Sequence, residues 1–401
     1  MPNTTHTNRL TSLVALRFAE NSNYLTLGAS ANFQDQLAGK RNGQSYEFVL
    51  RGTGVTYDGK TLPNSRNFAE RKITLSIVNK GVTVDTDSIE EVTDLSWDVE
   101  VAQPNGKKLS NKWVKEAIAA DLPACATAFV GSGFAPLAKA SAHLQSISEE
   151  DVFGFIDPQM QAILTSNGQQ FIPQGAPGDL YSKGFLGTFQ GAKYIGQRFI
   201  KQVVVPNLGA VTLSADSSDA ASVNATTGDL EIMIKGSGAS TAVLKAGTPL
   251  FFDGVYACDT VGDVTAVLAA FILKEDVTLN GTTAVKAKFV NKDLTAGGTM
   301  EIAKADGSAL ALTDFNSKSV TIPEAGTYFG GILHLDGAKE METLPQLSTS
   351  NADTTRGTQA GLSVFETRFF DGENMVNTTR WDAPVLRGVV EPRGFAYVLL
   401  K

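Results

Sequence analysis

Two stretches near the start of the chain alternate apolar and polar residues. This period of two is typical of strands that bury one face. The apolar positions are Tyr46, Phe48, Leu50, Ile73, Leu75 and Ile77. The residues between the two stretches are mostly polar. We therefore predict an extended hairpin within residues 39–87. Because an isolated two-stranded hairpin is marginally stable, it should lie against its own body or another copy of the chain.

A helical period appears at the N-terminus, where the spacing i, i+3, i+4, i+7, i+8 predicts an amphipathic helix. Its positions are Leu10, Leu13, Val14, Arg17 and Phe18. Two interpretations stay open: a helix packed on its own core, or an arm within residues 1–38 that docks on a neighbouring subunit. Arg9 and Arg17 precede the first acid, Glu20, so the segment is locally positive.

The clearest helical block covers residues 109–130, with an apolar stripe around Trp113 and Ile118. Pro123 should kink or restart this helix, because proline removes a hydrogen-bond donor and clashes with the preceding turn. Asp121 could cap the second half. A more polar helix is predicted over residues 136–145.

Three acids follow Ser148 directly and could be a carboxylate cluster for acid–base catalysis. We favour a capping box, with Ser148 as the N-cap and Asp151 three residues later. The segment Val152–Ile156 is then a short helix or a strand. Proline suits the first turn of a helix, so a helix should begin at Pro158 and run through Leu164.

Arginine is distributed unevenly. None of the twelve arginines lies between Arg198 and Arg356. Residues 208–325 carry eight lysines against fourteen acids, a net charge of −6. Short apolar runs separated by turn residues fill this interval, which is typical of an antiparallel barrel or sandwich. The runs are 211–213, 230–234, 250–256, 264–273, 284–290, 300–303 and 320–322. We therefore predict an inserted β domain over residues 208–325, between two halves of a host domain.

The C-terminal part returns to a mixed composition. Residues 328–335, 364–370, 385–390 and 395–400 are predicted strands. The last of them ends next to Lys401, so the C-terminus should lie in a sheet.

Composition narrows the functional classes. The chain has 401 residues, 42% of them hydrophobic and 19% charged, with a net charge of −8. It is too apolar to be disordered and too acidic to bind nucleic acid or anionic lipid through a basic face. The longest apolar run, residues 266–273, is too short to span a membrane, and residues 1–9 lack the apolar stretch of a signal peptide.

The cysteines and histidines indicate neither a disulfide scaffold nor a metal site. Two cysteines lie far apart, and three histidines share no ligand spacing; they are Cys125, Cys258, His6, His143 and His334. Glycines between residues 175 and 196 match no phosphate-binding pattern and are interpreted as turns. We predict no catalytic residue, cofactor or metal.

Two local motifs and the order of the elements together resemble the major capsid proteins of tailed bacteriophages, which share the Hong Kong 97 fold. Phe155-Ile156-Asp157-Pro158-Gln159 resembles the strand-to-helix transition of that family. Gly184-Phe185-Leu186-Gly187, followed by residues 194–205, resembles its glycine turn and outgoing strand. The inserted β region resembles that of coat proteins from certain short-tailed phages. One departure is that Pro123 breaks the helical block, whereas the family's spine helix is usually longer.

The resemblance implies an α+β chain with an inserted antiparallel β-barrel-like domain. The implied parts are an N-terminal arm (1–38), an extended hairpin (39–87), a peripheral domain with the spine helix (88–146), a first axial part (147–207), the inserted β domain (208–325) and C-terminal axial and peripheral strands (326–401).

The implied function is structural. Copies would assemble as hexamers and pentamers into an icosahedral shell that encloses double-stranded DNA without sequence-specific binding. A scaffolding protein, a portal and a decoration protein are implied partners. The chain would be made in the bacterial cytoplasm and reside in the virion, with no enzymatic activity and no membrane contact.

Candidates for contact between subunits are mostly arginines, because guanidinium offers two parallel hydrogen bonds to a carboxylate. They are Arg9, Arg17, Phe18, Arg41, Arg51, Arg66, Arg71, Arg368, Arg380 and Arg387. The alternative is that these arginines are solvated surface charges.

Two other functions stay open. A polysaccharide hydrolase on a β scaffold would need a pair of carboxylates about 5–10 Å apart, and acids are numerous here. A tail or decoration protein of a virion would be rich in strands, but the helical block argues against an all-β tube. No internal repeats typical of a fibre are evident.

Overall fold

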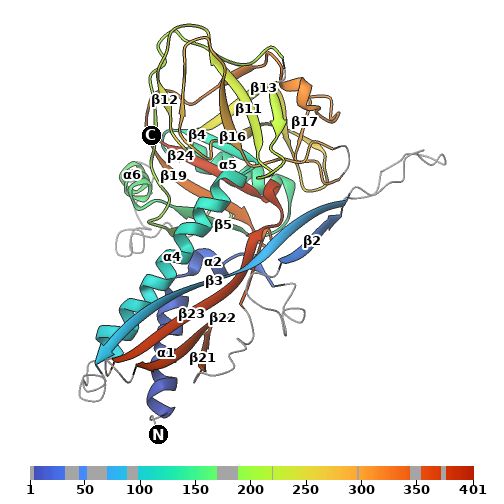
Figure 1. Ribbon diagram of the computed structural model, residues 1–401. Coiled ribbons are helices and arrows are strands. Elements are labelled where there is room, and N and C mark those ends of the chain that lie inside the picture. The colour runs from blue at the N-terminus through green and yellow to red at the C-terminus, as the bar shows by residue number, and fades with distance from the viewer. Residues whose placement is uncertain are drawn as a thin grey trace, which may run out of the picture. The chain divides into compact units, whose positions relative to one another are not determined.

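The computed structural model describes residues 4–31, 45–51, 70–87, 98–168, 188–218, 220–295, 298–343, 354–371 and 376–401. It contains both helices and many strands, which confirms the α+β class (Figure 1). The chain forms two compact units. Unit 1 comprises residues 1–48, 73–118 and 339–388, and unit 2 comprises residues 49–72, 119–338 and 389–401. Each is described separately below.

The predicted hairpin is present as two paired strands, which belong to a seven-stranded sheet. The sheet runs in the order β1 (Ala29–Ser30), β20 (Lys339–Thr343), β23 (Val376–Val389), β22 (Leu362–Asp371) and β21 (Thr354–Gln359), with β3 (Glu70–Asp87) paired to β23 and β2 (Ser45–Arg51) paired to β3. The predicted strands at 364–370 and 385–390 fall inside β22 and β23. The alternation of apolar and polar residues along β3 therefore predicted this strand correctly.

Helices cover one face of this sheet in unit 1. They are α1 (Thr4–Glu20), α2 (Asn23–Thr26) and α4 (Gln103–Asp121), with a π turn at Asp98–Ala102. The strand register puts Glu366, Trp381 and Val82 on the same face. Thr11 of α1 donates a 2.7 Å hydrogen bond to Glu366. The Trp113 Nε1 of α4 donates to the carbonyl of Ala383, at 3.2 Å, on the same face.

The N-terminal helix is built into unit 1. Leu10, Val14 and Phe18 are fully buried. A Cβ at Gly106 of α4 would lie 2.7 Å from the carbonyl oxygen of Val14, so glycine permits the close approach of the two helices. These contacts support the interpretation in which residues 10–20 pack on the core of their own chain.

Unit 2 contains a fifteen-stranded sheet. Strand β24 (Phe395–Leu400) lies between β4 (Thr127–Gly131), to which it is parallel, and β19 (Gly326–Leu335), to which it is antiparallel (Figure 1). The predicted strands at 328–335 and 395–400 are confirmed, and the C-terminal residues lie inside a sheet. Next to β19 come β5 (Val152–Ile156), β7 (Ala192–Gly196) and β6 (Thr188–Phe189), while β8 (Val203–Val205) also pairs with β19.

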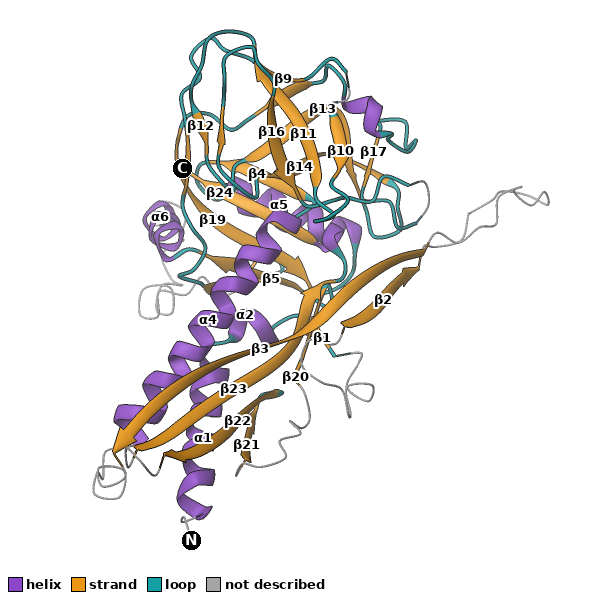
Figure 2. Ribbon diagram, viewed as in Figure 1, coloured by secondary structure: helices purple, strands orange, loops and turns teal. Residues whose placement is uncertain are grey.

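Two helices pack on this part of the sheet (Figure 2). They are α5 (Ala135–Ile147), which contacts β4, β24, β19 and β5, and α6 (Pro158–Gly168), which contacts β19. Both were predicted. The backbone N–H of Gln159 donates to the Asp157 side chain at 2.8 Å, which satisfies one free donor at the start of α6. The Gly184–Gly187 motif lies outside the described residues.

Residues 208–325, the inserted region, are built of short strands as predicted. They are β9 (Leu213–Ala215), β10 (Ala221–Val223), β11 (Leu230–Gly236), β12 (Val243–Leu244), β13 (Pro249–Cys258), β14 (Val264–Ile272), β15 (Val277–Thr278), β16 (Val285–Phe289), β17 (Ile302–Ala303) and β18 (Ser319–Thr321), with a 3-10 turn at Leu312–Phe315. One hydrophobic core has all its buried members between Leu213 and Val320. Four aromatic rings meet edge to face near its centre: Phe252, Phe271, Phe289 and Phe315.

Two pairings qualify the predicted barrel. Among the described residues the strands follow the order β10-β11-β9-β18-β13-β14, in which β10 is an end strand. Strand β16 pairs with β11 as well, beside this order. At the other end, Ala269 of β14 pairs with Thr127 of β4. The inserted region is therefore continuous with the remaining sheet of unit 2.

The helical block was predicted wrongly in its second half. Helix α4 ends at Asp121, Leu122–Ala124 form a 3-10 turn around Pro123, and Thr127–Gly131 are strand β4. The proline ends the helix instead of kinking it, and the following run gains a parallel partner, Ala396–Leu400, that is remote in sequence. Asp121 makes no side-chain cap.

The capping box at Ser148 was also wrong. Ser148 is the C-cap of α5, and its hydroxyl oxygen accepts from the Glu150 N–H at 3.3 Å. No helix begins there, because Val152–Ile156 form a strand between β19 and β7. The local capping signal was outweighed by the pairing of an apolar run with two neighbouring strands.

Candidate functional site

The six predicted contact residues whose side chains the structure describes do not converge on one site. Arg41 and Arg66 lie outside the described residues, and for Arg9 in α1 and Arg51 in β2 only the backbone is described. The six with described side chains fall into three groups, at the end of α1, at the start of β3, and on β22 and β23.

The end of α1 offers little to a neighbouring subunit. Arg17 forms a 2.6 Å ion pair with Glu20, one helical turn later. Phe18 is fully buried, so its side chain has no surface to present to another copy. The Phe18 prediction is corrected accordingly: this residue serves the core of unit 1.

Arg368, Arg380 and Arg387 lie on β22 and β23. The Nε of Arg368 is 2.6 Å from Glu366, and the Nε of Arg380 is 2.6 Å from Asp382. Both acids are buried, whereas the Arg380 side chain is 49% exposed. Burial, followed by the charges of Lys112 and Arg387, lowers the pKa of Lys80 from its ordinary value. Arg387 is thus one of the cations near Lys80, whose ammonium group also forms an ion pair with Glu116.

Glu366 is the polar centre of unit 1 and was not singled out from the sequence. Its Oε2 accepts hydrogen bonds from Thr11 at 2.7 Å and from the Trp381 indole at 2.9 Å, and its Oε1 accepts from Arg368. The residue is 1% exposed. Glu366, on β22, thus connects α1 with β23 through its hydrogen bonds and helps to position the helix on the sheet.

The opposite face of the same sheet carries an exposed apolar residue. Phe369 is 52% exposed and pairs across the sheet with Thr378, which donates a 2.7 Å hydrogen bond to Asp85. The register puts Arg380 and Thr83 on this face as well. We call these five residues the Phe369 patch. It combines one large apolar side chain with exposed polar and charged ones.

Arg71, at the start of β3, has a partner in its own chain. It forms an ion pair with Glu301 of unit 2, whose side chain is 2% exposed. Burial lowers the pKa of the Arg71 guanidinium from its ordinary value, while the charges of Asp293 and Glu391 oppose that shift. Arg71 thus belongs to a cluster of buried and half-buried charges.

Two further cations complete this cluster. Arg393 binds Glu391 through Nε and Nη2, both at 2.7 Å, and its Nη1 donates to the carbonyl of Gly298 at 2.7 Å. Lys292 donates to the carbonyl of Cys125 at 3.1 Å, and burial lowers the pKa of its ammonium group to about 8. Sequence inspection missed both residues: Cys125 is remote from Lys292 and Gly298 is remote from Arg393, although Glu391 is only two residues from Arg393.

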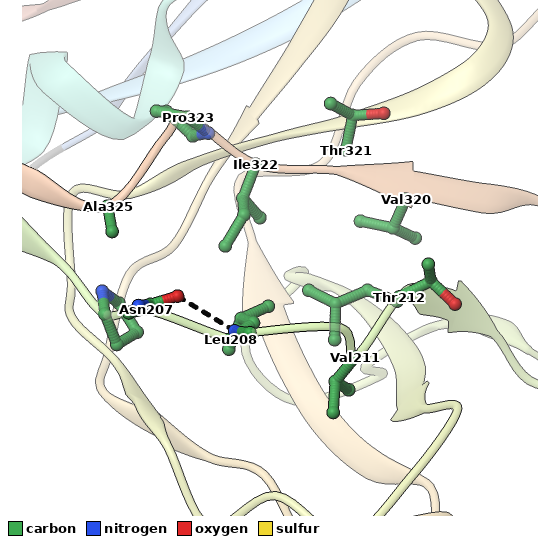
Figure 3. A pocket seen from close by; sticks show the side chains of 12 residues that line it. Asn207, Leu208, Val211, Thr212, Val320, Thr321, Ile322, Pro323 and Ala325 are labelled. Atoms are coloured by element: carbon green, nitrogen blue, oxygen red, sulfur yellow. Dashed lines mark hydrogen bonds between the residues drawn. The ribbon is translucent and has the colours of Figure 1, made fainter.

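Two pockets of unit 2 lie where the inserted region joins the remaining chain. One, of about 290 Å³, is lined by residues 206–209, 211–213, 320–323 and 325 (Figure 3). The Asn207 side-chain oxygen accepts from the Gly209 N–H at its edge. The second, of about 410 Å³, includes Glu324, Tyr328 and Lys401. The lining residues include one carboxylate, Glu324, whereas a glycosidase needs two.

The cysteines and the acidic residues of the described ranges bear on metal binding and on thiol reactivity. Within the described ranges, no group of three or more His, Cys, Asp or Glu side chains could hold a metal ion. Both cysteines are buried free thiols, and burial raises the pKa of Cys258 to about 12, so this thiol stays protonated. In the same described ranges, no helix is sufficiently long and apolar to cross a membrane.

Comparison with known proteins gives weak similarities in structure alone. No protein-family model matches the chain. No curated protein matches it either.

Among solved structures, the chain is similar to one from Mycobacterium phage Che8, at 10% identity and a TM-score of 0.46, covering 93% of this chain and 90% of the other. It is also similar to the capsid structure of the cyanophage P-SCSP1u, at 11% identity and a TM-score of 0.43, covering 90% and 84%. A virus-like particle from Pyrococcus furiosus gives 8% identity and a TM-score of 0.39, covering 97% of each chain. These identities are too low to transfer the role of any residue.

Proposed function

We propose that the chain is a major capsid protein, with the Hong Kong 97 fold, that assembles into the icosahedral shell of a tailed bacteriophage. The observation that carries this proposal is the order of elements along the chain. An N-terminal helix is followed by a long hairpin, a 19-residue helix and a mixed sheet, and a β-rich region lies between β8 and β19. This order is the one that the sequence resemblance implies.

Copies of the chain are the proposed partners, as hexamers and pentamers. A shell subunit needs several contact surfaces, because its binding energy is spread over several interfaces. The β2–β3 hairpin and the Phe369 patch are the surfaces we propose for this purpose. A scaffolding protein, a portal and a decoration protein remain proposed partners, and the virion remains the proposed location.

Arg380 is the strongest arginine candidate for a contact between subunits among those with described side chains. It is half exposed, and its guanidinium has donors beyond the Nε that faces Asp382. Arg17, Arg368 and Arg387 are weaker candidates by position. Arg9, Arg41, Arg51 and Arg66 stay predictions from the sequence.

The inserted region is proposed to be a domain that bridges or stabilises subunits in the shell. Its separate hydrophobic core supports this proposal. The region is acidic and the shell encloses its DNA by geometry, so no sequence-specific contact with DNA is proposed.

A hydrolase is the alternative from another functional class. The pocket linings described above include one acid, Glu324, where hydrolysis of a glycosidic bond requires a pair of carboxylates. The structural role is therefore preferred.

Sedimentation velocity tests the proposal. The purified chain, alone and co-expressed with a scaffolding protein, is expected to sediment as particles of megadalton size. A species no larger than a small oligomer in both preparations would contradict the proposed function. The variant Phe369→Ser should reduce the yield of particles, and Lys274→Gln, on an internally paired surface of the inserted region, is the matched control.

A further inference from the structure

A loop of the inserted region contacts three other parts of unit 2, at Cys125, Arg393 and Arg71. The loop covers residues 292–301, of which 296 and 297 lie outside the described residues. The Asp293 carboxylate accepts from the Thr295 hydroxyl at 2.6 Å and from the Thr299 hydroxyl at 2.9 Å. The Glu301 N–H donates to the carbonyl of Asp293 at 3.0 Å, so the loop closes on itself.

Each end of this loop is fixed to a different segment. Lys292 at one end donates to the carbonyl of Cys125, just before β4. Near the other end, Arg393 donates to the carbonyl of Gly298, and Glu391 holds the remainder of that guanidinium. These contacts fix the loop in unit 2 without a contribution from the hairpin.

Among the hairpin residues that the structure describes, Arg71 contacts the loop. Arg71 is the second residue of β3, and its neighbours Glu70 and Lys72 are exposed, as expected for alternation along a strand. Arg71 instead forms its ion pair with Glu301. Because a buried carboxylate without a partner is strongly unfavourable, separating this end of the hairpin from the loop has a large cost.

We propose that residues 292–295 and 298–301 are a clamp that holds residues 70–73 of β3 through the Arg71–Glu301 ion pair and orders them before a neighbouring subunit binds. Ordering a contact element in advance lowers the entropy that association must lose. The clamp thus assigns the inserted region a second task, that of preparing a contact surface elsewhere in the chain. The consequence for assembly rests on the proposed function, whereas the clamp itself does not.

Hydrogen exchange of the full-length chain, measured by mass spectrometry at a concentration without assembly, tests the clamp directly. In Arg71→Gln and in Glu301→Gln, amides of residues 70–73 should exchange about tenfold faster or more. In the double variant the effects should be less than multiplicative, because both members of one interaction are absent. Arg380→Gln breaks an ion pair on β23 and is the matched control, with unchanged exchange at residues 70–73.

Peptides around Phe252 and Phe271 report whether the inserted region stays folded. They should be unchanged in Arg71→Gln, which keeps that variant interpretable even where Glu301→Gln unfolds the loop. Exchange at residues 70–73 equal to that of Arg380→Gln, or effects that multiply fully, would overturn the clamp.

Particle formation separates the two proposals. With an intact capsid function, Arg71→Gln should raise the lowest concentration that gives particles by about tenfold, since the hairpin must then be ordered during association. Particles at the same concentration as the original chain would refute the assembly consequence. Faster exchange together with an absence of particles in every variant, the original chain included, would sustain the clamp and refute the capsid function.

Discussion

The inserted region and the sheet of unit 1 differ in how their surface side chains are paired or exposed. Six of the eight lysines of the inserted region form ion pairs with acids of the same region. The pairs are Lys235–Asp216, Lys245–Asp276, Lys274–Asp229, Lys286–Glu231, Lys288–Glu275 and Lys304–Asp314. In unit 1, helices cover one face of the sheet, while Phe369 and Arg380 are exposed on the opposite face.

The inserted region thus pairs most of its lysines internally, whereas the sheet of unit 1 exposes side chains that another protein can contact. A paired lysine on an exposed face gains little from another protein, because its single ammonium group already has a partner. Arg380 is also paired, through Nε, but its guanidinium carries further donors. An exposed aromatic ring beside an arginine is typical of a contact surface, since both residue types are enriched where proteins bind each other. We therefore expect substitutions in the two regions to act on different properties.

The largest effect should come from the core of the inserted region. Phe252→Ala removes a fully buried ring whose centroid is 4.9 Å from that of Phe271, and should lower the free energy of unfolding by about 4 kcal/mol. The matched change Phe369→Ala should cost less than about 0.5 kcal/mol, because that ring is half exposed. Denaturant titration of both variants measures the difference. Equal losses would remove the contrast between the two regions.

Acid should destabilise unit 2 through a buried histidine. Burial lowers the pKa of His143 to about 4, below its ordinary value of 6.5. The folded state thus favours the neutral ring, and its contribution is complete above pH 6.5 and is lost as the pH falls towards 4.

The loss should amount to about 3 kcal/mol at most, and His143→Phe should abolish that part of the pH dependence. Thermal unfolding followed from pH 7 to pH 4 checks this. An equal pH dependence in the variant would refute the assignment to His143.

The smallest effect should come from the surface pairs of the inserted region. Lys274→Gln removes a 2.5 Å ion pair with Asp229 and should change the free energy of unfolding by less than about 0.5 kcal/mol. Denaturant titration at low and high salt measures it. A decrease of more than about 2 kcal/mol in the free energy of unfolding would mean that these ion pairs stabilise the fold. The pairs would then do more than neutralise charges on the surface.

Local patterns predicted most strands, because a period of two is a property of neighbouring residues. The hairpin strands and the runs of the inserted region were found this way. The error at residues 127–131 arose because that run is a strand through pairing with residues remote in sequence, Ala396–Leu400 along its length and Ala269 at Thr127. Likewise, Arg71 and Glu301 are far apart in sequence, and no local signal connects them.

The sequence also indicated where arginines concentrate, but not their partners. Arg71, Arg368 and Arg380 all have acids of their own chain within ion-pair distance. Composition describes how much charge a region carries. Which of those charges a fold has already neutralised depends on contacts that only the folded chain brings together.

Electron microscopy of the purified chain, co-expressed with a scaffolding protein, tests the central claim most directly. The account predicts closed particles of uniform size whose averaged images have icosahedral symmetry. A field of isolated subunits or small oligomers, from preparations in which the chain is folded, would contradict it.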